Sequence, residues 1–256
     1  MSAEPILKTH GVTKRFGAIQ ALTEADFQVC PGEVMALVGD NAAGKSTLIK
    51  GIAGIYSFDE GDIFFEGKKV HIHSPRDASA LGIEVVYQDL ALADNLDVVA
   101  NMFLGRERTG AAFRLDEASM EKACVDTLTS LAVTTLRSVR LPVASLSGGQ
   151  RQSIAVAKAV MWNSKVVILD EPTAALGVAQ TRQVLDLVRR LADRGLAVVV
   201  ISHNLHDIFE VTDRITVLRL GQMVALYQTK EVTQQEVVHA ITAGKFKKVP
   251  GMVDFR

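Results

Sequence analysis

The chain has 256 residues, with 29 acidic and 28 basic side chains and a formal net charge of −1. This length is enough to bury a full hydrophobic core and lies near the upper end of what one domain reaches. The near balance of charge gives no overall positive field of the kind that attracts a nucleic-acid backbone, so it argues against nucleic acid as a partner.

The cysteines and the apolar segments argue against two further classes of protein. Cys30 and Cys124 share no metal-ligand spacing with the six histidines, which argues against a zinc site or a disulfide scaffold and fits a reducing compartment. The first residues, MSAEPILKTHGV, lack a basic region followed by an apolar core, and the longest apolar runs, such as 196–201, have the length of a strand. We therefore expect no signal peptide and no membrane span, so that any work at a membrane requires partner subunits.

Short apolar runs predict a sheet of buried parallel strands. In chain order these runs are EVMALVGD (33–40), IEVVY (83–87), KVVILDE (165–171) and LAVVVIS (196–202). The amphipathic segment 184–195 predicts a helix that ends at Gly195 and joins two of the strands. The segment 214–227 predicts a hairpin that turns near Leu220 and Gly221. Ligands of such sheets gather beyond the carboxyl ends of the strands.

The middle of the chain has a helical pattern instead. Apolar and small residues recur there at spacings of three and four, namely Met120, Ala123, Cys124, Thr127, Leu128 and Leu131, and later Ile154, Ala157 and Met161. The simplest account is a helical insert within a single α/β domain. We expect a core lobe at about 1–88 and 160–245, and a helical subdomain at about 89–159.

The segment GDNAAGKST (39–47) has the spacing of a phosphate-binding loop, and it stands between a predicted strand and a predicted helix. Its candidate nucleotide-binding residues are Gly39, Asp40, Asn41, Ala42, Ala43, Gly44, Lys45, Ser46 and Thr47. In such a loop successive N–H groups wrap the phosphates, Lys45 reaches the terminal ones, and the Ser46 hydroxyl binds Mg²⁺. The alternative, a glycine-rich turn with a solvated lysine, fits the flanking strand and helix less well.

Two acids close the run KVVILDE, where they would face the same ligand. Asp170 is a candidate ligand of Mg²⁺, directly or through water, because this ion prefers oxygen ligands. Glu171 is a candidate general base that takes a proton from the attacking water, a role worth about 10²- to 10⁴-fold in rate. A solvated pair of acids at a strand end is the structural alternative.

Three further residues are candidates by position. His203 follows the run LAVVVIS, where it can contact the γ-phosphate or orient the water. Gln88 follows IEVVY, and its amide oxygen can reach Mg²⁺ or the water. Phe16, in KRFGAIQ, can stack on adenine. A surface histidine, an unremarkable glutamine and a core aromatic ring are the alternatives.

The segment LSGGQ (146–150) opens the helical run IAVAKAVMW. Its glycines and its hydroxyl lie beside the unpaired N–H groups of a helix start, which is an arrangement that binds anions. We therefore expect Ser147, Gly148, Gly149 and Gln150 to contact a phosphate.

These segments together resemble the nucleotide-binding subunit of ATP-binding-cassette transporters over nearly the whole chain. The resemblance identifies Phe16 as the adenine-stacking residue, 39–47 as Walker A, Gln88 as the Q-loop, 146–150 as the signature motif, 166–171 as Walker B with its catalytic glutamate, and His203 as the switch histidine. It implies an α/β fold: a P-loop NTPase (RecA-like) core, an N-terminal antiparallel β subdomain and an α-helical insert with the signature motif. It also implies an ATPase that uses ATP and Mg²⁺.

The resemblance implies that LSGGQ binds the γ-phosphate of ATP held by a second copy of the chain. A helix N-terminus carries about half a positive charge, and Ser147 and the Gly149 N–H add directed donors. Each site is then complete only in a head-to-tail homodimer, and an isolated copy should be a poor ATPase.

The segment 71–107 is similar to the ATPases of simple-sugar importers. That likeness implies a membrane permease as partner, indirectly a sugar-binding protein, and a peripheral location on the cytoplasmic face of the cell membrane. A groove at 89–105 would receive a permease helix, with Leu90, Leu92, Leu96 and Met102 as candidate contacts and core packing as the alternative. The chain ends soon after HAITAGKF, so we expect one cassette without a regulatory domain.

Two residues depart from the family pattern. Ala42 stands where glycine is usual, and a positive φ there would cost about 1–2 kcal/mol and weaken ATP binding. Gly177 replaces the aspartate that usually closes the D-loop. Other readings are the ATPase of a non-sugar transporter, a soluble cassette ATPase acting on nucleic acid or ribosomes, a regulatory module without hydrolysis, and an exporter cassette.

Overall fold

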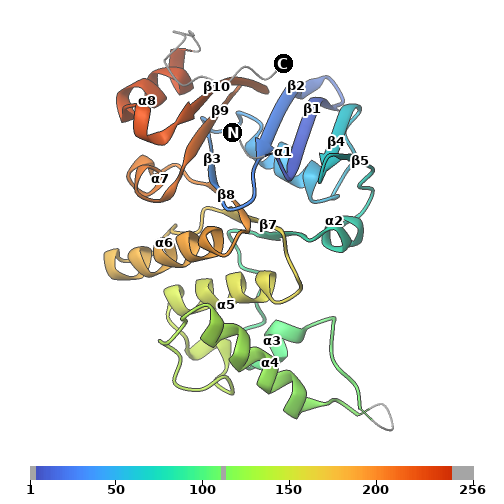
Figure 1. Ribbon diagram of the computed structural model, residues 1–256, viewed down its shortest axis with the longest axis vertical. Coiled ribbons are helices and arrows are strands. Elements are labelled where there is room, and N and C mark those ends of the chain that lie inside the picture. Colours follow the sequence, from blue (N-terminus) through green and yellow to red (C-terminus); the bar gives the residue numbers. More distant parts are fainter. Residues whose placement is uncertain (1–3, 111–113, 244–256) are drawn as a thin grey trace.

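The computed structural model describes residues 4–110 and 114–243 (Figure 1). The first part of the chain forms a four-stranded antiparallel sheet with the order β2-β1-β4-β5. Its strands are β1 (Leu7–Phe16), β2 (Ile19–Val29), β4 (Glu60–Phe65) and β5 (Lys68–Val70). The expected N-terminal antiparallel β subdomain is confirmed.

A second sheet has six strands in the order β10-β9-β3-β8-β7-β6. They are β3 (Val34–Val38), β6 (Ile83–Val86), β7 (Val166–Asp170), β8 (Ala197–Ile201), β9 (Arg214–Arg219) and β10 (Gln222–Gln228). Neighbouring strands are parallel except for the hairpin of β9 and β10. The four apolar runs and the hairpin were therefore predicted correctly.

The helices connect and cover these strands. They are α1 (Lys45–Ile52), α2 (Pro75–Leu81), α3 (Val98–Phe103), α4 (Glu117–Ser130), α5 (Gly148–Val160), α6 (Val178–Asp193), α7 (Leu205–Val211) and α8 (Gln234–Ala243), with 3-10 turns at Val143–Ser145 and Thr229–Glu231. The helix predicted at 184–195 begins earlier, at Val178, and ends at Asp193. Gly195, which follows it closely, has a φ of 90°. No helix in the described part of the chain is both long and apolar enough to cross a membrane.

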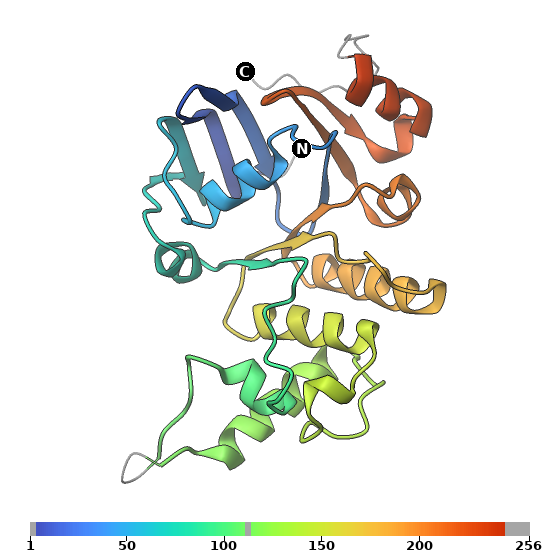
Figure 2. The same ribbon diagram turned by 180° about the vertical axis from the view of Figure 1, so that it is seen from behind.

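Helices α3, α4 and α5 gather in one half of the molecule, and both sheets lie in the other (Figures 1 and 2). Met120, Cys124 and Leu128 form the buried face of α4, as the helical spacing predicts. The division into a core lobe and a helical subdomain at the stated boundaries stays a prediction, and residues 1–3, 244 and 245 of the predicted core lobe lie outside the described residues.

The core consists of two clusters that the six-stranded sheet separates. Strand β3 supplies both, because successive side chains of a strand point to opposite faces. Ala36 lies in the cluster on the side of α5 and α6, whereas Leu37 lies in the cluster that includes α1 and the antiparallel sheet. Every residue of β3 and β8 is buried. The sheet thus fixes the ends of its strands rigidly, as a binding site requires.

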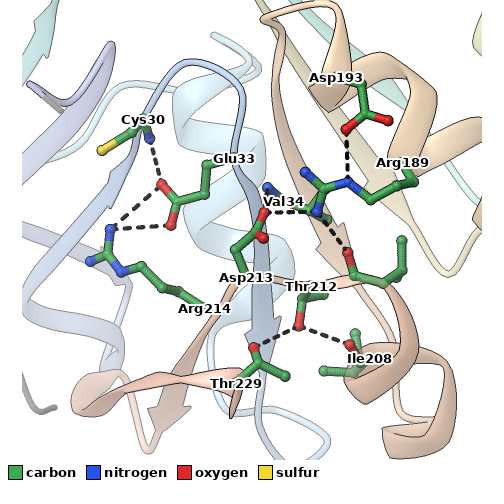
Figure 3. Close-up of polar contacts among 11 residues, drawn as sticks. Cys30, Glu33, Val34, Arg189, Asp193, Ile208, Thr212, Asp213, Arg214 and Thr229 are labelled. Carbon is green, nitrogen blue, oxygen red and sulfur yellow. Dashed lines mark hydrogen bonds and ion pairs between the residues drawn. The ribbon is translucent and has the colours of Figure 1, made fainter. Parts of the chain in front are cut away.

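Polar side chains join the amino-terminal ends of β3 and β9 (Figure 3). Asp213 accepts hydrogen bonds from the backbone N–H of Val34 and from Arg189, each at 2.9 Å. The largely buried pair of Arg214 and Glu33 lies beside them, with 3.2 Å between nitrogen and oxygen. Charges at this end pair with one another and hold the strands together.

Candidate functional site

The carboxyl ends of β3, β8, β7 and β6 are adjacent in the sheet. The loop after β3 is the predicted phosphate loop; β7 ends at the predicted Asp170, and the predicted Glu171 follows it directly. His203 and Gln88 follow β8 and β6 closely. The fold therefore brings candidates from four separate segments to one rim.

The phosphate loop leads directly into α1. Gly44 caps this helix with a φ of 106° and without a side-chain hydrogen bond. A methyl group on Gly44 would lie 2.7 Å from the carbonyl oxygen of Ala21, and one on Gly39 would lie 2.2 Å from that of Leu218. Both positions therefore require glycine. The first N–H groups of α1 have no side-chain cap, so they remain available to an anion.

Lys45 lies across the loop. Its Nζ donates to the carbonyl oxygens of Gly39 at 2.8 Å and Asp40 at 3.0 Å. Burial lowers the pKa of Lys45, while the nearby carboxylates of Glu171 and Asp170 oppose this shift. The ammonium group is thus placed between the loop and the acids, where a terminal phosphate would be drawn to it.

The three predicted ligands of Mg²⁺ line one open hollow. It has a volume of about 700 Å³, and Ser46, Gln88 and Asp170 lie on its wall with Lys50 and Tyr87. No group of three or more His, Cys, Asp or Glu side chains in the described chain has the arrangement of a metal site. One hydroxyl, one amide and one carboxylate fit Mg²⁺ at a phosphate, because this ion keeps several waters and takes further oxygen ligands from the phosphates.

Burial, and then the neighbouring Glu171, raise the pKa of Asp170, while Lys45 and Lys50 lower it. The carboxylate is therefore held in a place that disfavours its charge. A bound cation would relieve this, which is a further reason why the residues fit Mg²⁺.

Glu171 and His203 approach one another. The Oε2 atom of Glu171 lies 2.9 Å from Nδ1 of His203, with exposed side-chain fractions of 17% and 79%. The buried Oε2 makes no hydrogen bond within the described residues, so the two atoms are close without the alignment that a hydrogen bond needs. Glu171 also has a φ of 51°, a strained backbone of the kind found at functional sites.

Phe16 ends β1 and is 47% exposed, so it is not the core ring of the alternative interpretation. Its ring meets the ring of Tyr56 edge-on at 5.3 Å between centroids. Tyr56 in turn donates a hydrogen bond of 2.7 Å to the carbonyl oxygen of Thr47 in α1. Phe16 thus offers a partly exposed aromatic ring, linked through Tyr56 to the helix that follows the phosphate loop.

The signature segment is elsewhere. It opens α5, in the half of the molecule opposite to α1 (Figure 1), and it does not line the hollow that holds Ser46. Ser147 caps α5 and accepts a hydrogen bond from the Gln150 N–H at 3.4 Å, while the Gln150 side chain accepts one from the Ser147 N–H at 2.9 Å. Gly148 and Gly149 pack on Leu176 and Gln180, where a methyl group would come within 2.9 Å and 3.1 Å.

The two departures from the family pattern differ. Ala42 has a φ of 62°, so the positive φ on which its cost depends is present. Gly177 has a φ of −74°, and an added methyl group would meet nothing within 4 Å. Nothing in the structure explains the glycine at 177.

A second hollow, of about 200 Å³, lies between β6 and α5. Of the predicted permease contacts Leu90 lines it, whereas Leu92 packs against the core and Met102 is only 1% exposed. Met102 is therefore a core residue and the interpretation of it as a contact was wrong, because it faces inward from α3. Leu96 is partly buried and lies outside the hollow.

Sequence reasoning missed several residues of the two hollows. Lys50 could have been predicted from the sequence, because it lies one helical turn after Ser46 on α1 and so shares its face of the helix. Leu104, Arg106, Lys158 and Trp162 line the second hollow. No local pattern connects residues 104–106 with 158–162, since the packing of α3 against α5 alone brings them together.

The comparisons with known proteins agree with this geometry. The fructose import ATP-binding protein FrcA of Rhizobium meliloti is 48% identical over 251 residues, 96% of each chain. The xylose/arabinose import ATP-binding protein XylG of Sulfolobus acidocaldarius is 45% identical, over 95% of this chain and 96% of that protein. A crystal structure of a nucleotide-free ATP-binding cassette from an ABC transporter superposes with a TM-score of 0.79 at 26% identity, covering 93% of this chain and 96% of that one.

The family model described as ABC transporter matches residues 22–174, which include the phosphate loop, the signature segment and both acids of β7. The match spans more than half of the chain. This chain therefore belongs to the ABC transporter family.

Proposed function

We propose that this chain hydrolyses ATP to ADP and phosphate and thereby drives the import of a simple sugar through a membrane permease. The observation that carries the proposal is the meeting of the phosphate loop, Asp170 and Glu171 at one rim of the sheet. The sugar class rests on relatives that are named as fructose and xylose/arabinose import proteins.

The phosphates of ATP bind at the open start of α1, and Phe16 stacks on the base. Lys45 exchanges its bonds with the loop carbonyls for bonds to the terminal phosphates. Ser46 and Asp170, with Gln88 beside them, hold Mg²⁺, which neutralises charge on the phosphates when it is bound.

Glu171 acts as the general base. Its Oε2 makes no hydrogen bond within the described residues and can accept a proton from the water that attacks the γ-phosphorus, while the bond from that phosphorus to the bridging oxygen breaks. His203, within 2.9 Å of this oxygen, orients the water or the γ-phosphate. The Glu171 side chain is only 17% exposed, so bulk water screens its carboxylate less than a fully exposed one.

The start of α5 completes the site of a second copy. Ser147, Gly148, Gly149 and Gln150 lie away from the hollow of their own chain, which supports a head-to-tail homodimer in which they contact the γ-phosphate of the partner's ATP. Dimerisation then depends on the nucleotide, and an isolated copy turns over slowly.

The second hollow is the proposed contact with the permease. Its wall combines apolar side chains such as Leu90 with the charged Arg106 and Lys158, so it suits a helix that carries both apolar and charged side chains. A chain bound there lies peripherally on the cytoplasmic face of the cell membrane, and a sugar-binding protein delivers the sugar to the permease from the other side.

Deletion of this protein from the cells that produce it should abolish their uptake of one simple sugar. Unchanged uptake of fructose, xylose and ribose alike would contradict this part.

Glu171→Gln tests the chemistry. The amide keeps the size of the side chain but cannot take the proton, so we expect turnover to fall about 10²- to 10⁴-fold. ATP binding should persist, and dimers with bound ATP should accumulate in size-exclusion chromatography. Glu231→Gln, at an exposed site in the turn Thr229–Glu231, is the matched control and should behave as the original protein. Turnover near the original rate in Glu171→Gln would remove Glu171 from the role of base.

A further inference from the structure

Tyr56 joins two parts of the proposed nucleotide site that the chain leaves far apart. Phe16, at the end of β1, is the proposed base platform, and Thr47 belongs to the first turn of α1. We infer that Tyr56 is a positioning residue for the base of the nucleotide, because it holds the ring of Phe16 at a fixed place relative to the phosphate loop. The inference rests on the proposed function, in which ATP binds at this loop.

The contact with Tyr56 leaves much of the Phe16 ring exposed. The two rings are nearly perpendicular, at 85°, with 5.3 Å between their centroids. Edge-to-face contact of this kind is favourable and directional. Phe16 remains 47% exposed, so a base can still stack on it.

The contact with α1 fixes Tyr56 itself. Its hydroxyl donates a hydrogen bond of 2.7 Å to the carbonyl oxygen of Thr47, the residue after Ser46. Burial raises the pKa of Tyr56, so the hydroxyl stays protonated and keeps donating. The ring therefore moves with the helix whose N-terminus binds the phosphates.

Lys14 fixes the same pair from one side. Its Nζ lies 5.5 Å from the ring centroid of Phe16 and 5.4 Å from that of Tyr56. The carbonyl oxygen of Ser57 and the carboxylate of Asp59 hold this Nζ at 2.8 Å and 2.9 Å. Because Lys14 is already bonded, it serves as an anchor for both rings and is not free to read the base.

The consequence concerns the cost of binding. Phe16 stands at the end of a hairpin strand, where an unsupported ring would sample several rotamers. Ordering such a side chain on binding weakens affinity. Tyr56 orders it beforehand, at a set distance from the phosphates, so its effect should appear only for ligands that contain a base.

The test compares two ligands on the full chain. Binding of ATP and of inorganic tripolyphosphate, each with Mg²⁺, is measured by calorimetry for the original protein, Tyr56→Leu, Phe16→Ala and the double variant. We expect Tyr56→Leu to raise the Kd for ATP about three- to tenfold and to leave the Kd for tripolyphosphate unchanged. In the Phe16→Ala background the same substitution should have no further effect on ATP.

Each outcome decides a separate point. Equal loss of ATP and tripolyphosphate, or additive effects in the double variant, would overturn the positioning role and leave Tyr56 as a support of α1 alone. Phe16→Ala with unchanged ATP binding would instead refute the base platform of the proposed function. Tyr56→Phe serves if the leucine variant does not fold: it keeps the ring and removes only the bond to Thr47, and an ATP Kd equal to that of the original protein would overturn the inference.

Discussion

Two helix starts in this chain look alike in sequence and differ in structure. Helix α1 begins after Gly44 with no side-chain cap, whereas α5 begins after Ser147 with a reciprocal cap between Ser147 and Gln150. Around α1 there is a strained Ala42 and an acid, Asp170, with a raised pKa. The start of α5 has none of these features, and its glycines pack on Leu176 and Gln180.

The difference between the two helix starts indicates which of them requires the nucleotide. The region of α1 has helix N–H groups without a side-chain cap and a half-buried carboxylate whose charge is disfavoured, so it gains most from ATP with Mg²⁺. The region of α5 is satisfied within its own chain and offers only its remaining N–H groups. We therefore expect substitutions at α1 to change binding by a single copy, and substitutions at α5 to change only steps that require two copies.

The largest expected effect is that of Lys45→Ala. The ammonium group is the charge that the loop directs toward the terminal phosphates, so its loss should raise the Kd for ATP about a hundredfold. This Kd is measured by equilibrium binding of a fluorescent ATP analogue. Lys122→Ala, on the exposed side of α4, should leave the Kd unchanged. Tight ATP binding by Lys45→Ala would contradict the assignment of the start of α1 as the phosphate-binding site.

Ser147→Ala tests the other start. We expect turnover to fall about a hundredfold, as it does when one donor to a developing charge is removed, while ATP binding by a single copy stays the same. Loss of the cap should also lower the free energy of unfolding by about 1 kcal/mol.

Asp116→Ala is the matched control for Ser147→Ala, because Asp116 caps α4 in the same manner, by accepting from the Ser119 N–H at 3.1 Å. It should lower stability to a similar extent and leave turnover intact. If both variants lost turnover equally, the effect would belong to stability and the comparison of the two starts would fail.

Asp170→Asn should stabilise the nucleotide-free protein while abolishing hydrolysis. The raised pKa means that the folded chain binds more protons than the unfolded chain above the ordinary value of about 3.9, so the contribution of Asp170 to stability falls as pH rises through its folded pKa. Removing the charge should therefore raise the free energy of unfolding by about 0.5–2 kcal/mol near pH 8. In urea unfolding this gain should shrink as the pH falls toward the ordinary pKa of about 3.9. Asp193→Asn, at an exposed ion pair, should give no such gain.

The sequence predicted the rim well and the contacts across it poorly. Asp170 and His203 follow buried strands, and the apolar runs alone place those ends together. Tyr56 went unnoticed because its contact with Phe16 joins residues that no helical or strand period relates. Met102 was misjudged because an apolar side chain on a short helix looks the same in sequence whether it faces the core or a partner.

The smallest expected effect is that of Ala42→Gly, which measures how much the positive φ of Ala42 costs in stability. Glycine relieves about 1–2 kcal/mol at a positive φ but loses about 0.5–1 kcal/mol more conformational freedom on folding. The net gain in stability should therefore lie between about 0 and 1.5 kcal/mol. Ala175→Gly, at a φ of 59° after β7, offers the same relief away from the phosphate loop and should give the same gain in thermal unfolding.

The two glycine variants should also agree in ATP affinity. The fold holds Ala42 at a φ of 62°, so we expect the cost of the methyl group to be met on folding and not on binding. A ligand shifts an equilibrium only by binding one conformation more tightly than another. We expect the same strained conformation of Ala42 in the free and in the ATP-bound loop. We therefore expect the Kd of Ala42→Gly for ATP to stay within about twofold of the original value. A Kd several-fold lower, with Ala175→Gly unchanged, would show that the loop changes its backbone when the phosphates bind.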